Sequence, residues 1–232
     1  FSRYLGGIDD DAAYSMKIDT SNNLFVNGGT KSTDFPIVGN TLNTTFLGGD
    51  ADGYIAKLDN SNGAIINSTF IGTDNYDQVY FVQLDLDDDV YVFGQSENGY
   101  PVSGPVYNNP NSGQFIHKLN NDLTTSIWST SIGAGSGHVE ISPTAFLVSD
   151  CYDIYFAGWG GETNSNSFNS LASFSSSSGF PTTPDAYQST TNGNNFYLAV
   201  LDRDAQFLKY GTYFGGVSSS SNHVDGGTSR FD

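Results

Sequence analysis

The sequence predicts an all-β fold built from repeated, short, four-stranded units. The chain of 232 residues is rich in Gly (27), Tyr (14) and Phe (17). Aromatic residues favour strands, and Gly together with Ser, Asn and Asp favours the tight turns between them. Several short motifs recur in the same order along the chain, without a helical period between them. Hydrophobic residues make up 37% of the chain, which suffices for a β core if alternate strand positions are buried.

The first recurring motif is an apolar or aromatic strand that ends in Gly. It is found four times, as Tyr4-Leu5-Gly6-Gly7, Phe70-Ile71-Gly72, Ser131-Ile132-Gly133 and Tyr213-Phe214-Gly215-Gly216. The second motif is a strand, a polar turn and another strand, at residues 14–28, 80–94 and 145–158. Because each apolar run is short and is bounded by Gly, Asn or Asp, both motifs indicate strands.

Two further motifs complete each copy. The third is an aromatic-Pro step, found as Phe35-Pro36, Tyr100-Pro101 and Phe180-Pro181. Proline at these points is expected to end a strand or to lie in a connection. The fourth is a strand, at residues 54–59, 115–120 and 197–202, and a short turn leads from it into the next copy.

The spacing of the motifs is nearly constant. Asp19, Asp85 and Asp150 close equivalent strands, and the two intervals between them are almost equal. Each copy therefore holds four short strands in meander order, which is typical of one blade of a β-propeller. A single blade buries little surface, so consecutive blades are expected to stack. An open β-solenoid is the structural alternative, although its coils usually repeat every ~20–30 residues.

We therefore expect residues 1–232 to form an incomplete β-propeller of about three four-stranded blades plus the start of a fourth. The copies span approximately residues 3–68, 69–129, 130–211 and, in part, 212–232. Since propellers typically have about 4–8 blades, we expect the chain to be an internal piece of a longer secreted protein.

Charge and composition exclude several classes of function. Eight Lys and Arg against 25 Asp and Glu give a formal net charge of −17, which would repel nucleic acids and anionic membranes. No run approaches the roughly 18 apolar residues of a membrane-spanning helix, so no transmembrane segment is predicted. Cys151 is the only cysteine, which rules out a disulfide within the chain.

The repeat resembles the bacterial β-propeller repeat family called SBBP. The motifs that carry the resemblance are Tyr4-Leu5-Gly6-Gly7, Ala12-Ala13-Tyr14, Ser32-Thr33-Asp34-Phe35-Pro36, Ala56-Lys57-Leu58-Asp59 and the segment from Gly179 to Gln188. The middle copy departs from the pattern, with Thr73 for the second Gly and Tyr100 for Phe. The resemblance implies a large surface protein of gliding, Bacteroidetes-type bacteria, exported by the type IX secretion route and used in adhesion or display. It implies no catalytic residues.

Clustered carboxylates are the only candidates for a metal site. Asp85, Asp87 and Asp89 form a D-x-D-x-D run, and Asp50 and Asp52 form a second short acidic step. Carboxylate oxygens are suitable ligands for calcium. An EF-type loop would need Gly and Glu at later positions, and this run lacks both, so the alternative is a plain strand-to-strand turn rich in Asp. Calcium at Asp85, Asp87 and Asp89 is the one cofactor that we consider.

An insertion in the third copy is the candidate ligand-binding segment. The stretch from Gly158 to Phe180 is much longer than the equivalent stretches in the first two copies. The inserted segment contains Trp159, Phe168 and Phe174, whose rings could stack on a sugar. Long loops on a rigid scaffold often carry recognition, although a loop without function is the alternative.

The sequence thus favours a non-enzymatic scaffold or adhesin that is extracellular or at the cell surface, associated with the outer membrane. Its expected partners are a glycan or a surface protein, and the secretion machinery during export. Two alternatives stay open: a propeller enzyme, such as a polysaccharide lyase or hydrolase, and a calcium-stabilised spacer. Against an enzyme, His117, His138 and His223 have no metal-ligand spacing, and no repeated cluster of His, Arg and Glu occurs.

Overall fold

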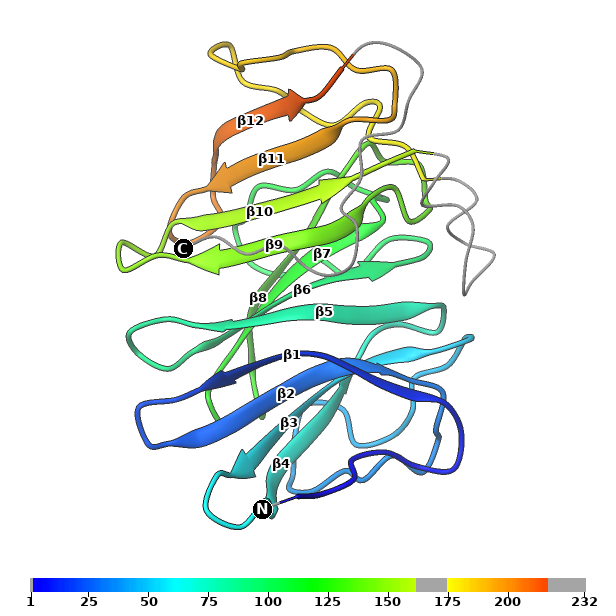
Figure 1. Cartoon of the computed structure of the whole chain (residues 1–232), viewed down its shortest axis with the longest axis vertical. Coiled ribbons are helices and arrows are strands. Elements are labelled where there is room, and N and C mark those ends of the chain that lie inside the picture. Colours follow the sequence, from blue (N-terminus) through cyan, green and yellow to red (C-terminus); the bar gives the residue numbers. More distant parts are fainter. Residues whose placement is uncertain (1, 162–174, 217–232) are drawn as a thin grey trace. The chain divides into compact units, whose positions relative to one another are not determined.

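The computed structural model describes residues 2–161 and 175–216, and all regular structure in them is β. The strands form three antiparallel four-stranded sheets, labelled in Figure 1. Their bounds are β1 Asp11–Ile18, β2 Asn23–Thr30, β3 Asp52–Asp59, β4 Ile65–Ile71, β5 Asp77–Leu84, β6 Val90–Ser96, β7 Gln114–Leu119, β8 Ser126–Ile132, β9 Ser142–Val148, β10 Ile154–Trp159, β11 Phe196–Leu201 and β12 Leu208–Phe214. The predicted all-β class is confirmed. No helix in this part of the chain is long and apolar enough to span a bilayer.

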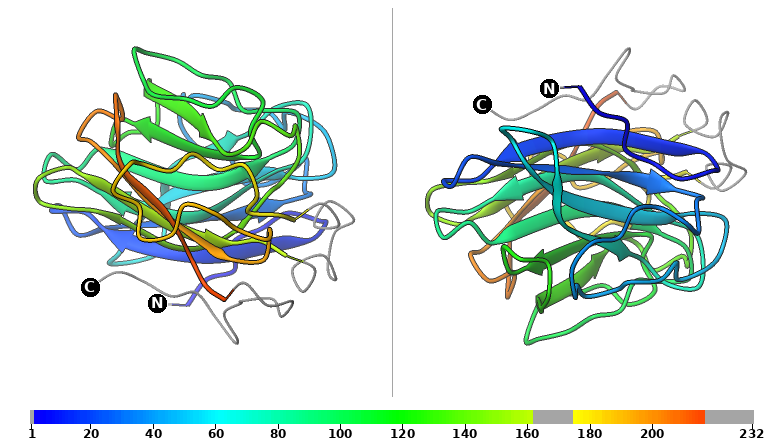
Figure 2. Two further views of the ribbon diagram at one scale, coloured as in Figure 1. Left: turned by 90° about the horizontal axis from the view of Figure 1, so that it is seen from above. Right: turned by 90° about the horizontal axis from the view of Figure 1, so that it is seen from below.

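Each sheet is a simple meander in which neighbouring strands follow one another along the chain. The sheets are ordered β1 to β4, β5 to β8 and β9 to β12. Figure 2 gives two further views of the strands, coloured along the sequence. The motif that ends in Gly forms the last strand of a sheet, as β4, β8 and β12. Its first copy, at residues 4–7, lies outside the strands, and Tyr4 is fully exposed.

The chain divides into two compact units, and the division passes through β7 and β8. The first unit comprises residues 1–96 and 116–129, and the second comprises residues 97–115 and 130–232. Within the first unit, β5 packs against β1 and β2 of the first sheet. Tyr14 of β1 stacks on Tyr80 of β5, with ring centroids 4.9 Å apart. Sheet-on-sheet packing of this kind buries the apolar side chains that alternate along each strand.

An aromatic pair accounts for two of the recurring motifs. In the first unit, the Phe35 ring of the aromatic-Pro step packs on Tyr54 of β3, with centroids 4.2 Å apart. Phe70 of β4 completes this buried cluster. In the second unit the same pairing recurs as Tyr100 with Phe115 and Phe180 with Tyr197. The aromatic-Pro step therefore places a ring over the third strand of each sheet.

Candidate functional site

The predicted calcium residues lie in the turn between β5 and β6. The Asp85 carboxylate accepts hydrogen bonds from the backbone N–H groups of Asp87 and Asp89, both at 3.0 Å, and from the Tyr91 hydroxyl at 3.1 Å. The ammonium group of Lys118 lies 3.0 Å from carboxylate oxygens of both Asp85 and Asp89. A lysine thus already bridges two of the three carboxylates, and calcium there would have to displace it.

Burial and hydrogen bonding act in opposite directions on Lys118. Burial disfavours the ammonium group and would lower its pKa. Hydrogen bonds with Tyr91, Asp85 and Asp89 outweigh burial and raise the pKa above its ordinary value. The first sheet has the equivalent arrangement, with Lys57 3.6 Å from Asp19. In the first and second sheets, the Asp that follows the first strand therefore pairs with a lysine of the third strand.

The predicted binding residues are only partly within the described residues. Trp159 ends β10, where it pairs with Phe196 of β11 and Ser142 of β9, and its side chain is half-buried. Phe168 and Phe174 lie outside the described residues. Stacking of a sugar on the three rings together therefore stays a prediction.

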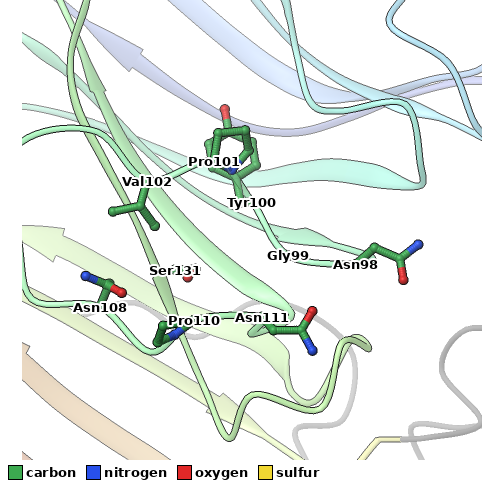
Figure 3. A pocket seen from close by; sticks show the side chains of 9 residues that line it. All are labelled: Asn98, Gly99, Tyr100, Pro101, Val102, Asn108, Pro110, Asn111 and Ser131. Atoms are coloured by element: carbon green, nitrogen blue, oxygen red, sulfur yellow. The ribbon is translucent and has the colours of Figure 1, made fainter.

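A groove of about 540 Å³ lies in the second unit, at the loop between β6 and β7 (Figure 3). It is lined by Asn98, Gly99, Tyr100, Pro101, Val102, Asn108, Pro110, Asn111 and Ser131. Figure 3 shows Val102 and Asn108 toward one end of it and Asn98 and Asn111 toward the other. All but Ser131, which is on β8, come from the connection that contains the second aromatic-Pro step.

The groove has a fixed backbone. Tyr100 is buried and stacks on Phe115, with centroids 3.9 Å apart and rings nearly parallel, which anchors the start of the loop. Asn98 and Asn111 both have left-handed backbones, a conformation that Asn tolerates better than most residues. Gly137 connects them, because its N–H donates to the Asn111 carbonyl and its carbonyl accepts from the Asn98 N–H. These contacts hold the two ends of the lining together.

The chemistry of the lining is neutral and mixed. Val102 is 41% exposed, and Pro101 and Pro110 are also exposed, so the groove offers apolar surface. The Asn108 amide uses one N–H to bond the Val106 carbonyl, at 3.3 Å. Of the nine lining residues only Tyr100 is ionisable, and its ring is buried. Apolar faces with a few amides suit a ligand with hydroxyl or amide groups and no net charge.

A carboxylate–imidazole pair adjoins the groove. Glu97, next to Asn98, accepts a hydrogen bond from the Val139 N–H at 2.9 Å, and its other oxygen lies 3.0 Å from His138 Nδ1. No local motif indicates this pair, because 41 residues separate its members. Glu97 is almost fully buried, whereas the side chain of His138 is 43% exposed. These two contacts connect the loop before β9 to the residue that follows β6.

The other two histidines differ in setting. His117 of β7 is buried, and its Nε2 lies 2.7 Å from the Ser126 hydroxyl. Burial lowers the pKa of His117 to about 4, so it is neutral at physiological pH. His223 lies outside the described residues. In the described ranges, no three His, Cys, Asp or Glu side chains come together as metal ligands.

Comparison with known proteins adds no relative. No protein-family model matches the chain, and no curated protein matches it. The resemblance to SBBP repeats therefore remains a prediction from the motifs.

Proposed function

We propose that the chain is a non-enzymatic β-propeller module of a secreted or cell-surface bacterial protein, and that its groove binds an uncharged glycan. The neutral lining of Asn amides, prolines and Val102 is the observation that carries the proposal. Sugar hydroxyls hydrogen-bond to amides, while the C–H faces of sugar rings pack on apolar groups. In this role the module is a scaffold or adhesin that presents loops from rigid sheets.

The architecture supports the propeller part of the proposal. Three four-stranded meanders follow one another along the chain, and the same aromatic pair holds the aromatic-Pro step over the third strand of each. Radial stacking of such units is how propellers bury both faces of each sheet. The SBBP-like motifs support export by the type IX route to the outer surface. The secretion machinery and, secondarily, a surface protein are the other proposed partners.

A glycan array of charged and uncharged oligosaccharides tests the binding proposal. The chain is expected to bind a subset of the uncharged ones. Replacing Asn108 by Ala is expected to weaken binding about tenfold, since one or two lost hydrogen bonds are worth about 1–2 kcal/mol. Asn40→Ala, which changes an exposed Asn in the connection between β2 and β3, is the matched control and should bind normally. Binding only to charged glycans, or to none, would refute the proposal.

The Glu97–His138 pair favours one alternative, a polysaccharide lyase or hydrolase, because a carboxylate beside an imidazole can act as an acid–base pair. Its carboxylate, however, is held by the Val139 N–H and lies outside the groove lining. Incubation with a panel of polysaccharides distinguishes the two functions. No turnover is expected, whereas turnover abolished by Glu97→Gln would replace the scaffold proposal by the enzymatic one.

A further inference from the structure

Two loops of the first unit meet where β3 and β5 begin. Gly49 has a left-handed backbone, and a Cβ atom placed on it would lie 2.1 Å from the Asn75 carbonyl oxygen, so only Gly allows this approach. The Asp77 N–H donates to the Ala51 carbonyl at 2.8 Å. The residues that open the two strands are therefore held side by side by backbone contacts.

These loops enclose two carboxylates. Asp52 opens β3 and Asp77 opens β5, and both are fully buried. One oxygen of Asp52 accepts the Leu47 N–H at 2.5 Å, and one oxygen of Asp77 accepts the Thr73 N–H at 2.6 Å. The Oδ1 atom of each carboxylate is buried and has no hydrogen-bond partner.

The two carboxylates face the same glycine. A Cβ atom on Gly72 would lie 2.8 Å from Asp52 Oδ1 and 2.9 Å from Asp77 Oδ2. Within the described residues, neither carboxylate has the lysine partner that Asp19 and Asp85 have. Two buried carboxyl groups are thus close together, and the described side chains supply no positive charge beside them.

Such a pair has to be neutralised by a proton or a cation, because an isolated carboxylate is very unfavourable in a buried site. Burial, reinforced for Asp52 by the charge of Asp77, raises the pKa of Asp52 to about 7. Burial likewise raises the pKa of Asp77 to about 6, and the nearby charge of Asp74 acts in the same direction. Protons therefore leave the pair close to neutral pH, where a cation can take their place.

We propose that Asp52 and Asp77 bind one divalent cation of the calcium type, which ties the start of β3 to the start of β5. The charge of two carboxylates matches that of the ion, and carboxylate oxygens are its preferred ligands. The unpartnered Oδ1 atom of Asp52 faces Gly72 and supplies one free oxygen. On the Asp77 side, Oδ2 faces the same glycine and also accepts from Thr73. The ion would join the first sheet to the strand that packs against it, and it would stabilise that contact.

The site is specific to the first copy of the repeat. Aligning Tyr54 with Phe115 and Tyr197 places Gly113 and Asn195 at the position of Asp52. Asn195 is already engaged, since its amide oxygen accepts from Thr191 and its amide nitrogen donates to the Gly216 carbonyl. A single cation per chain is therefore expected. The site is also separate from the Asp85 turn, where Lys118 provides the positive charge.

Calcium titration of the chelator-treated chain, followed by calorimetry and thermal unfolding, tests the proposal. Near neutral pH we expect saturable binding of one calcium per chain and a rise in Tm. Affinity should fall about tenfold per pH unit between about pH 7 and 6, where a proton competes for Asp52, and more steeply below about pH 6, where protons compete for both carboxylates. Absence of binding to the unmodified chain would overturn the proposal.

Two variants locate the site. Asp52→Asn keeps an oxygen for the Leu47 N–H and should abolish both calcium binding and the rise in Tm. Asp77→Asn is a second test with the same expected loss, should the first variant fail to fold by circular dichroism. Asp87→Asn is the control and should bind as the unmodified chain does. Binding that survives in either folded variant, or that is lost in the control, would place calcium elsewhere and contradict the proposal.

Discussion

The ring of Phe35 packs on the ring of Tyr54, with centroids 4.2 Å apart, although a long connection without strands separates the two residues along the chain. The equivalent rings meet in the other two copies, as Tyr100 with Phe115 and Phe180 with Tyr197. The pair explains why an aromatic-Pro step and an aromatic third strand recur together. It also fixes the connection that forms the groove in the second copy.

Loss of the Phe35 ring should be strongly destabilising. Phe35 is 3% exposed, and Phe→Ala changes in cores typically cost about 3–5 kcal/mol through lost burial and the cavity left behind. Urea unfolding of Phe35→Ala should show a loss of this size. Phe207→Ala is the matched control, because Phe207 is 65% exposed and should change stability by less than about 0.5 kcal/mol. Equal losses in the two variants would show that the aromatic pair does not stabilise the fold.

The strands themselves were predictable, because their signals are local. Residues 14–19 and 24–28 were expected as strands, and β1 and β2 cover Asp11–Ile18 and Asn23–Thr30. Short apolar runs bounded by Gly and Asx turns are sufficient for that. The four-stranded meander was also expected from the order of the motifs, but its limits were not, because the motif that ends in Gly forms the last strand of each sheet, as β4, β8 and β12.

Lys118 should be essential to the turn between β5 and β6. Lys118→Met removes the positive charge between Asp85 and Asp89 and leaves a buried carboxylate uncompensated, which typically costs about 3–5 kcal/mol. Lys209→Met is the control, because Lys209 pairs with Asp153 at the surface, where solvent screens ion pairs and they contribute little. Urea unfolding measures the loss in free energy of unfolding for each variant. A smaller loss for Lys118→Met than for Lys209→Met would contradict the role assigned to Lys118.

The Asp85 run also shows what sequence patterns miss. Asp85, Asp87 and Asp89 resemble a metal loop because carboxylates alone are visible in a short motif. Lys118 lies 33 residues further on than Asp85, and only the pairing of the strands brings its ammonium group to that carboxylate. In the same way, Asp52 was visible as part of an acidic step, but its neighbour Asp77 comes from the next sheet.

Without calcium, stability should fall as the pH rises through the pKa values of Asp52 and Asp77. Their folded-state pKa values, about 7 and about 6, are raised above those of the unfolded chain. The folded protein therefore holds more protons between about pH 4 and 7, and raising the pH removes this advantage. The free energy of unfolding of Asp52→Asn, measured in the presence of a chelator, should change less with pH over this range than that of the unmodified chain. An unchanged slope would mean that the pair is not buried as described.

His117 should produce the opposite slope on the acid side. Its folded-state pKa of about 4 lies below the unfolded value of about 6.5. The contribution of neutral His117 to the free energy of unfolding is therefore fully present above about pH 6.5. It decreases as the pH falls toward 4, by up to about 3 kcal/mol. His117→Gln, which cannot titrate, should lose this decrease in acid unfolding curves. A full acid decrease that persists in His117→Gln would contradict the assignment to burial of His117.

The groove could not be located from the sequence, because its residues are ordinary turn residues. The connection that contains Asn98, Asn108 and Asn111 has an ordinary length. Only the inserted segment after Trp159 is unusually long. What makes the groove is the stacking of Tyr100 on Phe115 and the two backbone bonds of Gly137. These contacts depend on how the strands pair and pack, which no local motif encodes.

Calorimetric titration with an uncharged oligosaccharide selected on the array tests the central claim most directly. We expect one binding site, an affinity about tenfold weaker for Asn108→Ala, and an unchanged affinity for Asn40→Ala. Equal affinities in all three proteins would show that the groove is not the binding site and would contradict the proposed function.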